Sequence, residues 1–255
     1  MKPTLAYQLK RVRRAAACRL ALLSTRGVAF LQCRAPLPAL HYPGLRASDR
    51  LIVFLPGIGD VAEDFQVRGF IAALYGSALP ADAVAVDAHF GYYARRSVID
   101  RLAHDVVLPA RARGYSEVWL VGISMGGMGA LSYVAHHPEH VSRALLLAPY
   151  LGEARLIREL AEAGGIGELP KQATTNEDHL RRLWHWIGRY ASSRPLSPKL
   201  YLGYGTRDRF AHANALLGAH LPARHVITVP GGHDWRTWMK LWARFLASWS
   251  ARDER

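Results

Sequence analysis

The sequence predicts an α/β fold, in which a mostly parallel central sheet is flanked by helices. Short apolar runs of strand length alternate with stretches of helical periodicity, as a parallel sheet requires. These runs are continuously apolar, which is typical of strands that are buried on both faces. The chain has 255 residues, half of them hydrophobic, so it is long enough to bury one such core.

The elements are predicted in chain order from these runs. We expect strands at 51–55, 83–86, 118–121, 143–147, 199–203 and 224–229. We expect helices around 67–75, 95–113, 125–137 and 235–249, and a helical insertion at 151–198. Because the carboxyl ends of parallel strands meet at one edge of the sheet, polar residues that follow them should converge there. The residues in such positions are Ser124, Asp208, His233, Asp87 and the loop 57–59.

The basic character of the chain is concentrated at its N-terminus. The formal net charge is +13, of which residues 1–50 contribute +9, with ten Lys or Arg against one acid. The rest of the chain is nearly balanced and has no basic stripe with interleaved aromatics, so we expect no nucleic-acid partner. Metal-ligand spacings, a phosphate loop and a dinucleotide fingerprint are also missing from the sequence, so we expect no metal and no cofactor.

Residues 1–46 are interpreted as a basic leader and linker that precede one domain at 47–255. A cationic stretch followed by an apolar one resembles a degenerate export signal or lipid anchor, although Arg19 and Arg26 interrupt the apolar part. Alternatively, the segment is an amphipathic helix that contacts an anionic membrane surface. A third interpretation is a disordered leader with an edge strand near Val28–Leu31. The apolar stripe of the helical interpretation is Leu5, Leu9, Val12, Ala16, Leu20 and Leu23. The protein is accordingly expected to be cytoplasmic, or exported or membrane-anchored. In either case no run is long enough for a membrane-spanning helix.

The stretch from Glu117 to Ala130 contains the motif G-x-S-x-G between a predicted strand and a predicted helix. A serine at such a sharp turn has a strained backbone, and side chains two residues away would collide with the neighbouring elements. Gly122 and Gly126 remove those side chains, so the hydroxyl of Ser124 can project into a cleft. The N-terminus of the helix, with its partial positive charge, points to the same place. The motif therefore predicts a nucleophilic serine, against the alternative of an ordinary glycine-rich turn.

A nucleophilic serine needs a base, and the base needs a carboxylate that fixes its tautomer. The order Ser124, Asp208, His233 supplies nucleophile, acid and base from three strand ends. Glu153 and Asp234 are rival acids, and His89 is a weaker candidate for the base. The alternatives are a surface histidine at position 233 and a turn-forming aspartate at position 208.

The oxyanion of an acyl-transfer intermediate needs two backbone N–H donors. The first is expected at Met125, at the start of the helix. The second is expected at Ile58, since Gly57 and Gly59 let that loop turn inward. The alternative is a plain tight turn that leads into a helix capped by Asp60. The expected pocket residues are Gly57, His89, Tyr92 and Trp235.

These motifs resemble the serine esterases and lipases of the α/β-hydrolase superfamily. The run from Gly122 to Ala130, together with Gly232-His233-Asp234-Trp235 and Trp238, is similar to the esterase D group. The resemblance covers about residues 50–250 and assigns the family's nucleophile, acid and base to the three residues named above. One departure is Pro56-Gly57, where many relatives have His-Gly. The resemblance also implies that the insertion at 151–198 is a small cap. Its aromatic residues, Trp184, Trp186 and Tyr190, either line an acyl pocket or pack the cap onto the body.

We therefore expect a serine hydrolase that cleaves an uncharged, small-molecule carboxylic ester with a short or medium acyl group. An acyltransferase with the same three residues, or a non-catalytic binding protein of this fold, is the alternative. A further alternative is a protein that binds a membrane surface or a nucleic acid through its basic leader.

Overall fold

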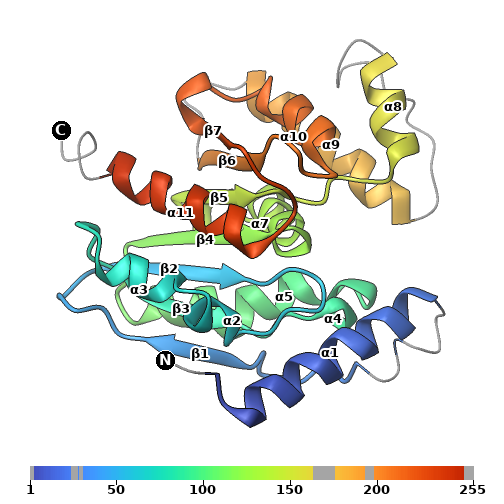
Figure 1. Ribbon diagram of the computed structural model, residues 1–255. Coiled ribbons are helices and arrows are strands. Elements are labelled where there is room, and N and C mark those ends of the chain that lie inside the picture. Colours follow the sequence, from blue (N-terminus) through green and yellow to red (C-terminus); the bar gives the residue numbers. More distant parts are fainter. Residues whose placement is uncertain (1–2, 24–27, 29–30, 163–175, 193–197, 250–255) are drawn as a thin grey trace.

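The computed structural model describes residues 3–23, 28, 31–162, 176–192 and 198–249. A seven-stranded sheet runs through the middle of the molecule in the order β1-β3-β2-β4-β5-β6-β7 (Figure 1). All pairs in this sheet are parallel except β1 with β3. The predicted α/β fold with a mostly parallel sheet is thus confirmed. The strands are β1 Ala39–Tyr42, β2 Arg50–Leu55, β3 Asp82–Val86, β4 Glu117–Ile123, β5 Arg143–Leu147, β6 Lys199–Gly205 and β7 Val226–Val229.

Helices cover both faces of the sheet, because successive side chains of each buried strand point to opposite sides. Val53 and Leu55 of β2 pack with α5, α6, α7, α9 and α10, whereas Ile52 and Phe54 pack with α2, α3 and α11. The helices are α1 Leu5–Leu23, α2 Asp64–Val67, α3 Phe70–Tyr75, α4 Phe90–Ala94, α5 Val98–Leu102, α6 Leu108–Ala112, α7 Met125–His136, α8 Ala154–Glu162, α9 Asn176–Ser192, α10 Ala211–Gly218 and α11 Trp235–Trp249.

Two predicted boundaries are corrected by the structure. The helix expected at 95–113 begins only at Val98, since Arg96 has a left-handed φ of 55°, and a π-helical segment at 103–107 separates α5 from α6. The last strand begins at Val226, because Ala223–His225 form a 3₁₀ turn after Pro222. Two of the four residues of the edge strand expected near Val28–Leu31, at positions 29 and 30, lie outside the described ranges. β1 forms the antiparallel edge further along the chain.

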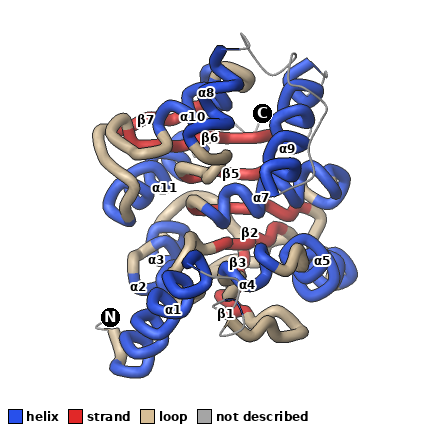
Figure 2. Tube along the Cα trace, turned by 90° about the vertical axis from the view of Figure 1, so that its right-hand side faces the viewer, coloured by secondary structure: helices blue, strands red, loops and turns tan. Residues whose placement is uncertain are grey.

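The N-terminal segment forms the helix α1 over Leu5–Leu23. In Figures 1 and 2, α1 lies beside α2 and α4 at one end of the sheet, while α8 and α9 lie at the other end. Among the helices that the structure describes, none is long and apolar enough to cross a membrane.

The helical insertion expected between 151 and 198 contains α8 and α9. Trp184 and Tyr190 of α9 are buried against the sheet face that α7 also covers. The indole N–H of Trp184 donates to the Leu151 carbonyl, and the Tyr190 hydroxyl donates to the Pro198 carbonyl. These two aromatics therefore pack the insertion onto the body. The function of the insertion as a cap stays a prediction.

Candidate active site

Ser124 occupies a strained turn between β4 and α7. Its backbone has φ 52° and ψ −112°, and the residue is only 4% exposed. A Cβ at Gly122 would approach the Gly126 carbonyl oxygen to 2.2 Å, and a Cβ at Gly126 would approach that of Leu55 to the same distance. Only glycine fits at both positions, so the sequence around Ser124 permits the close passage of β2, β4 and α7 that the turn needs.

Ser124 is hydrogen-bonded to a histidine that is in turn hydrogen-bonded to a carboxylate. The Nε2 atom of His233 lies 2.9 Å from the Ser124 Oγ. The Nδ1 atom of His233 lies 2.8 Å and 3.0 Å from the two carboxylate oxygens of Asp208. With Nδ1–H donating to the carboxylate, Nε2 is left as an acceptor for the serine proton. The structure thus brings together the three residues that the sequence places after β4, β6 and β7.

The loops that carry Asp208 and His233 are held by short-range contacts. The Phe210 amide donates to the Asp208 carboxylate at 2.8 Å, which fixes the turn after β6. The imidazole of His233 lies edge-on to the rings of Phe210 and Trp238, with centroids 4.9 Å and 5.1 Å away. Since the Asp208 side chain is fully buried and that of His233 is 11% exposed, the pair is shielded from bulk water.

The two rival carboxylates are engaged elsewhere. Glu153 accepts a hydrogen bond from the Tyr150 hydroxyl at 2.7 Å. Asp234 accepts hydrogen bonds from the amide and the hydroxyl of Thr237 and so caps α11. Asp208 is therefore the acid whose contacts with His233 match the arrangement expected from the sequence.

The loop that follows β2 lies next to Ser124. A Cβ at Gly57 would be 3.6 Å from the Ser124 Cβ, so this glycine lets the loop approach the serine closely. The Asp60 amide donates to the Gly57 carbonyl, and Gly59 has a φ of 82°, as in a type II turn. Ile58 lies inside this turn. Met125 begins α7, where backbone N–H groups have no intrahelical acceptor. The roles of these two amides stay predictions.

A model of the α/β-hydrolase fold family matches residues 99–167. Among solved structures, Est1E from Butyrivibrio proteoclasticus is similar over 83% of this chain and 92% of its own, with 14% identity and a TM-score of 0.58. FphF, a fluorophosphonate-binding serine hydrolase from Staphylococcus aureus, is similar over 87% and 96%, with 13% identity and a TM-score of 0.59. The s-formylglutathione hydrolase FrmB from the same organism is similar over 82% of each chain, with 14% identity and a TM-score of 0.55. This chain has the α/β-hydrolase fold. A comparison with curated proteins finds no match.

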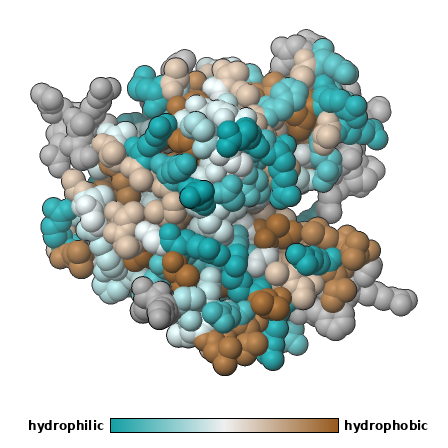
Figure 3. All heavy atoms as spheres, in the orientation of Figure 1, coloured by the Kyte–Doolittle hydropathy of each residue, from teal (hydrophilic) through white to brown (hydrophobic). Residues whose placement is uncertain are grey.

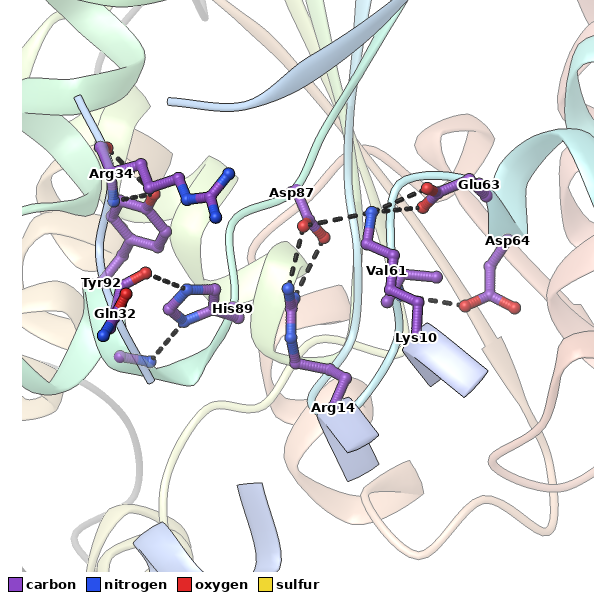
Figure 4. A network of polar contacts seen from close by, with 11 residues as sticks. Lys10, Arg14, Gln32, Arg34, Val61, Glu63, Asp64, Asp87, His89 and Tyr92 are labelled. Atoms are coloured by element: carbon purple, nitrogen blue, oxygen red, sulfur yellow. Dashed lines mark hydrogen bonds and ion pairs between the residues drawn. The ribbon is translucent and has the colours of Figure 1, made fainter. Parts of the chain in front are cut away.

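Two of the expected pocket residues of this α/β-hydrolase fold, His89 and Tyr92, form hydrogen bonds with backbone groups of the protein. Both ring nitrogens of His89 are engaged, since Nδ1 accepts from the Gly91 amide and Nε2 faces the Gln32 carbonyl (Figure 4). Burial, reinforced by the charge of Arg14, lowers the pKa of His89 to about 4. His89 is therefore neutral near pH 7 and caps α4. The Tyr92 hydroxyl donates to the backbone carbonyl of Arg34 and accepts from its amide.

The fourth expected pocket residue, Trp235, supports the loop after β2. Its indole N–H donates to the Asp60 carboxylate at 3.2 Å, and its ring packs edge-on against Phe65 and Phe70. The assignment of Gly57, His89, Tyr92 and Trp235 to a substrate pocket stays a prediction.

A group of carboxylates beside the loop after β2 was not anticipated from the sequence as a unit. Asp60, Asp64 and Asp87 are all buried, and the helix α1 supplies their cationic partners. Burial, together with the negative charge of Asp64, raises the pKa of Asp60 to about 6. The opposite holds for Asp87, where the hydrogen bonds and charge of Arg14 outweigh burial and lower the pKa. The available signal was the clustering of acids just after two strands, opposite a cationic N-terminal segment.

Two other features lie away from Ser124. His137, Glu139 and His140 place three possible metal ligands within 4.8 Å of one another, at the opposite end of α7 from Ser124. A hollow of about 720 Å³ lies among Ala47–Asp49 and Arg113–Tyr115, at the amino ends of β2 and β4. Neither feature adjoins the carboxyl ends of the strands, so neither belongs to the candidate active site.

Proposed function

We propose that this protein is a serine hydrolase that cleaves carboxylic esters through an acyl-enzyme on Ser124. The observation that carries the proposal is the continuous hydrogen-bonded chain from the Ser124 Oγ through His233 to Asp208, at the carboxyl ends of the strands. Such a chain lets the hydroxyl lose its proton as it attacks, which a free serine does not do at neutral pH.

The first half of the reaction forms the acyl-enzyme. The Ser124 Oγ attacks the ester carbonyl carbon while its proton passes to Nε2 of His233. Asp208 stabilises the resulting imidazolium through the Nδ1 hydrogen bond. The tetrahedral oxyanion accepts hydrogen bonds from the amides of Met125 and Ile58. As the intermediate collapses, His233 gives its proton to the departing alcohol oxygen, and the acyl group stays on Ser124.

The second half returns the enzyme to its starting state. A water molecule attacks the acyl carbon and gives one proton to Nε2 of His233. A second tetrahedral intermediate then collapses, the carboxylic acid leaves, and His233 returns the proton to the Ser124 Oγ. The similar structures support a hydrolase, since they include the hydrolases FphF and FrmB. The aromatic residues near the strand ends favour an uncharged acyl group.

The proposal is tested with nitrophenyl esters from acetyl to dodecanoyl. Ser124→Ala should lower kcat by a factor on the order of 10⁶ and leave the circular dichroism spectrum unchanged. A matched control is Ser132→Ala, because Ser132 is also buried, lies on the same helix and faces a histidine, His179, at 3.0 Å. The control should keep its turnover, since no described carboxylate contacts that histidine.

Fluorophosphonate labelling followed by intact-mass measurement provides a second readout. The wild type should gain one phosphonyl group and Ser124→Ala should gain none. A wild type that neither labels nor hydrolyses any ester would instead be a non-catalytic binding protein. A wild type that labels, but releases product only when an alcohol acceptor is added, would be an acyltransferase.

A further inference from the structure

The helix α1 turns its cationic side toward the protein. Lys10 contacts Glu63 at 2.7 Å, and Arg14 makes two hydrogen bonds to Asp87, at 2.9 Å and 3.0 Å (Figure 4). Arg11 lies 3.1 Å from Asp64, on the same side of the helix. These carboxylates neutralise the three cations, and salt bridges with buried carboxylates fix the rotation of α1 about its own axis.

The inner face also makes an apolar contact with the loop after β2. Cys18 and Ala21 are buried against Ile58, Phe90 and Leu31. The backbone at Ala15 is 3.7 Å from the position that a Cβ would take at Gly59. Because that loop also approaches Ser124, α1 and the candidate active site lie at the same edge of the sheet.

This orientation leaves the apolar stripe of α1 in contact with solvent. Among the described residues, the large hydrophobic side chains that are exposed lie mainly on α1, and the exceptions are Leu45 and Leu108. Figure 3 shows apolar residues gathered over α1. The exposed fractions are 71% for Leu5, 49% for Leu9, 68% for Val12, 52% for Leu20, 60% for Leu22 and 84% for Leu23. A contiguous group of exposed apolar side chains usually marks a surface that binds another protein or a membrane.

The charges beside the stripe indicate what covers it. Arg13 and Arg19 are exposed, and on a helix of 3.6 residues per turn they fall on opposite sides of the stripe. An apolar stripe bordered by arginines matches the interface of an anionic bilayer, where the apolar side chains enter the acyl region and the guanidinium groups meet phosphates. A second copy of the chain would bring the same arginines and a second net charge of +13, so it is disfavoured.

We propose that the outer face of α1 binds the surface of anionic lipid bilayers. The helix lies parallel to the membrane, held to the protein by its inner cations and to the lipid by its outer stripe. This places the edge that carries Ser124 next to the bilayer. The binding does not depend on the proposed ester hydrolysis, so Ser124→Ala should bind vesicles as the wild type does.

The experiment is co-sedimentation of the full-length protein with vesicles of phosphatidylcholine alone or of phosphatidylcholine and phosphatidylglycerol in a 7:3 ratio. The wild type should bind the anionic vesicles, and binding should weaken as salt screens the arginines. Leu9→Gln/Val12→Gln/Leu20→Gln should weaken that binding by at least about tenfold, since it removes three apolar anchors. Arg13→Gln/Arg19→Gln should remove the preference for the anionic vesicles.

The matched control is Leu45→Gln/Leu108→Gln, which changes the exposed leucines outside α1 and should bind like the wild type. All variants should keep the circular dichroism spectrum and the turnover of a soluble nitrophenyl ester, because the changed side chains are exposed. The proposal is overturned if the triple variant binds as tightly as the wild type, or if the wild type binds neither vesicle at low salt. It is also overturned if sedimentation velocity shows a dimer that the triple variant abolishes, since the stripe would then be a contact between two copies.

Discussion

Asp208 and Asp87 stand in equivalent places but have different partners. Each lies just past the carboxyl end of a strand of the sheet, and each is more than 90% buried. Asp208 faces the imidazole of His233, whose other ring nitrogen contacts the Ser124 hydroxyl. Asp87 faces the guanidinium of Arg14, which is always charged. The first carboxylate can support a changing charge, whereas the second neutralises a permanent one.

The comparison shows that a place at the carboxyl end of a strand does not by itself make a residue catalytic. What each carboxylate can do depends on the side chain that it contacts, His233 for Asp208 and Arg14 for Asp87. In both cases that side chain comes from another part of the chain. The predictions below separate the two kinds of carboxylate, because loss of the first should affect turnover and loss of the second should affect stability.

The largest effect is expected for Asp208→Asn. The amide keeps the shape of the side chain but can donate a hydrogen bond to Nδ1, so His233 takes the wrong tautomer and cannot accept the serine proton. Turnover of nitrophenyl acetate should fall by a factor on the order of 10⁴, with little change in melting temperature. Asp87→Asn serves as the paired variant and should keep turnover within tenfold. Equal losses of turnover in the two variants would contradict the assignment of a catalytic role to Asp208 and a structural role to Asp87.

Arg14→Met should act mainly on stability. Among the described residues, the substitution leaves the buried Asp87 with one cationic neighbour, Lys10 at 3.4 Å. Removal of one partner from a buried ion pair typically costs about 3 kcal/mol. Urea denaturation of the full-length protein measures this loss. Arg155→Met is the control, because the Arg155–Glu159 pair is exposed and such pairs contribute about 0.5 kcal/mol. A stability loss no larger than that of the control would show that Asp87 is not dependent on α1.

Most of the fold and the arrangement of Ser124, His233 and Asp208 could be predicted from the sequence. The buried strands are continuous apolar runs, and α11 has the predicted bounds, Trp235–Trp249. The glycines at 122 and 126 marked the turn at Ser124, and the strand ends pointed to Asp208 and His233. These signals are local, since each depends on residue types within a few positions.

The docking of α1 could not be predicted, because its partners lie about fifty to seventy residues further along the chain. The sequence gives the amphipathic pattern of this helix, but nothing in it says which face turns inward. Long cationic side chains normally lie in water, and here four carboxylates beside the strand ends reverse that preference. The position of the edge strand β1 within residues 28–42 could not be predicted for a related reason. Its four residues lie between prolines, and their partner is the distant β3.

Asp60→Asn should change the pH dependence of stability. Since burial and Asp64 raise the pKa of Asp60 to about 6, the folded protein holds a proton near pH 5 that the unfolded chain has released. The stability due to this proton is fully present below pH 4 and is lost as the pH rises through 6. Between pH 5 and pH 8, the free energy of unfolding of the wild type should therefore fall by about 1.4 kcal/mol relative to that of the variant. Urea denaturation at both pH values measures the difference, and a constant difference would contradict the raised pKa.

Glu153→Gln should have the smallest effect of these substitutions, and it compares Asp208 with a carboxylate that does not contact His233. Glu153 also follows a strand end, but its carboxylate accepts from the Tyr150 hydroxyl and makes no described contact with His233. An amide oxygen can accept the same hydrogen bond, so kcat/KM for nitrophenyl acetate should stay within about threefold of the wild type. A loss near that of Asp208→Asn would mean that the carboxylate at 153 supports the histidine during turnover. A small loss in this variant, next to a large one in Asp208→Asn, would show that contact with the imidazole distinguishes a catalytic carboxylate from its neighbours at the same edge.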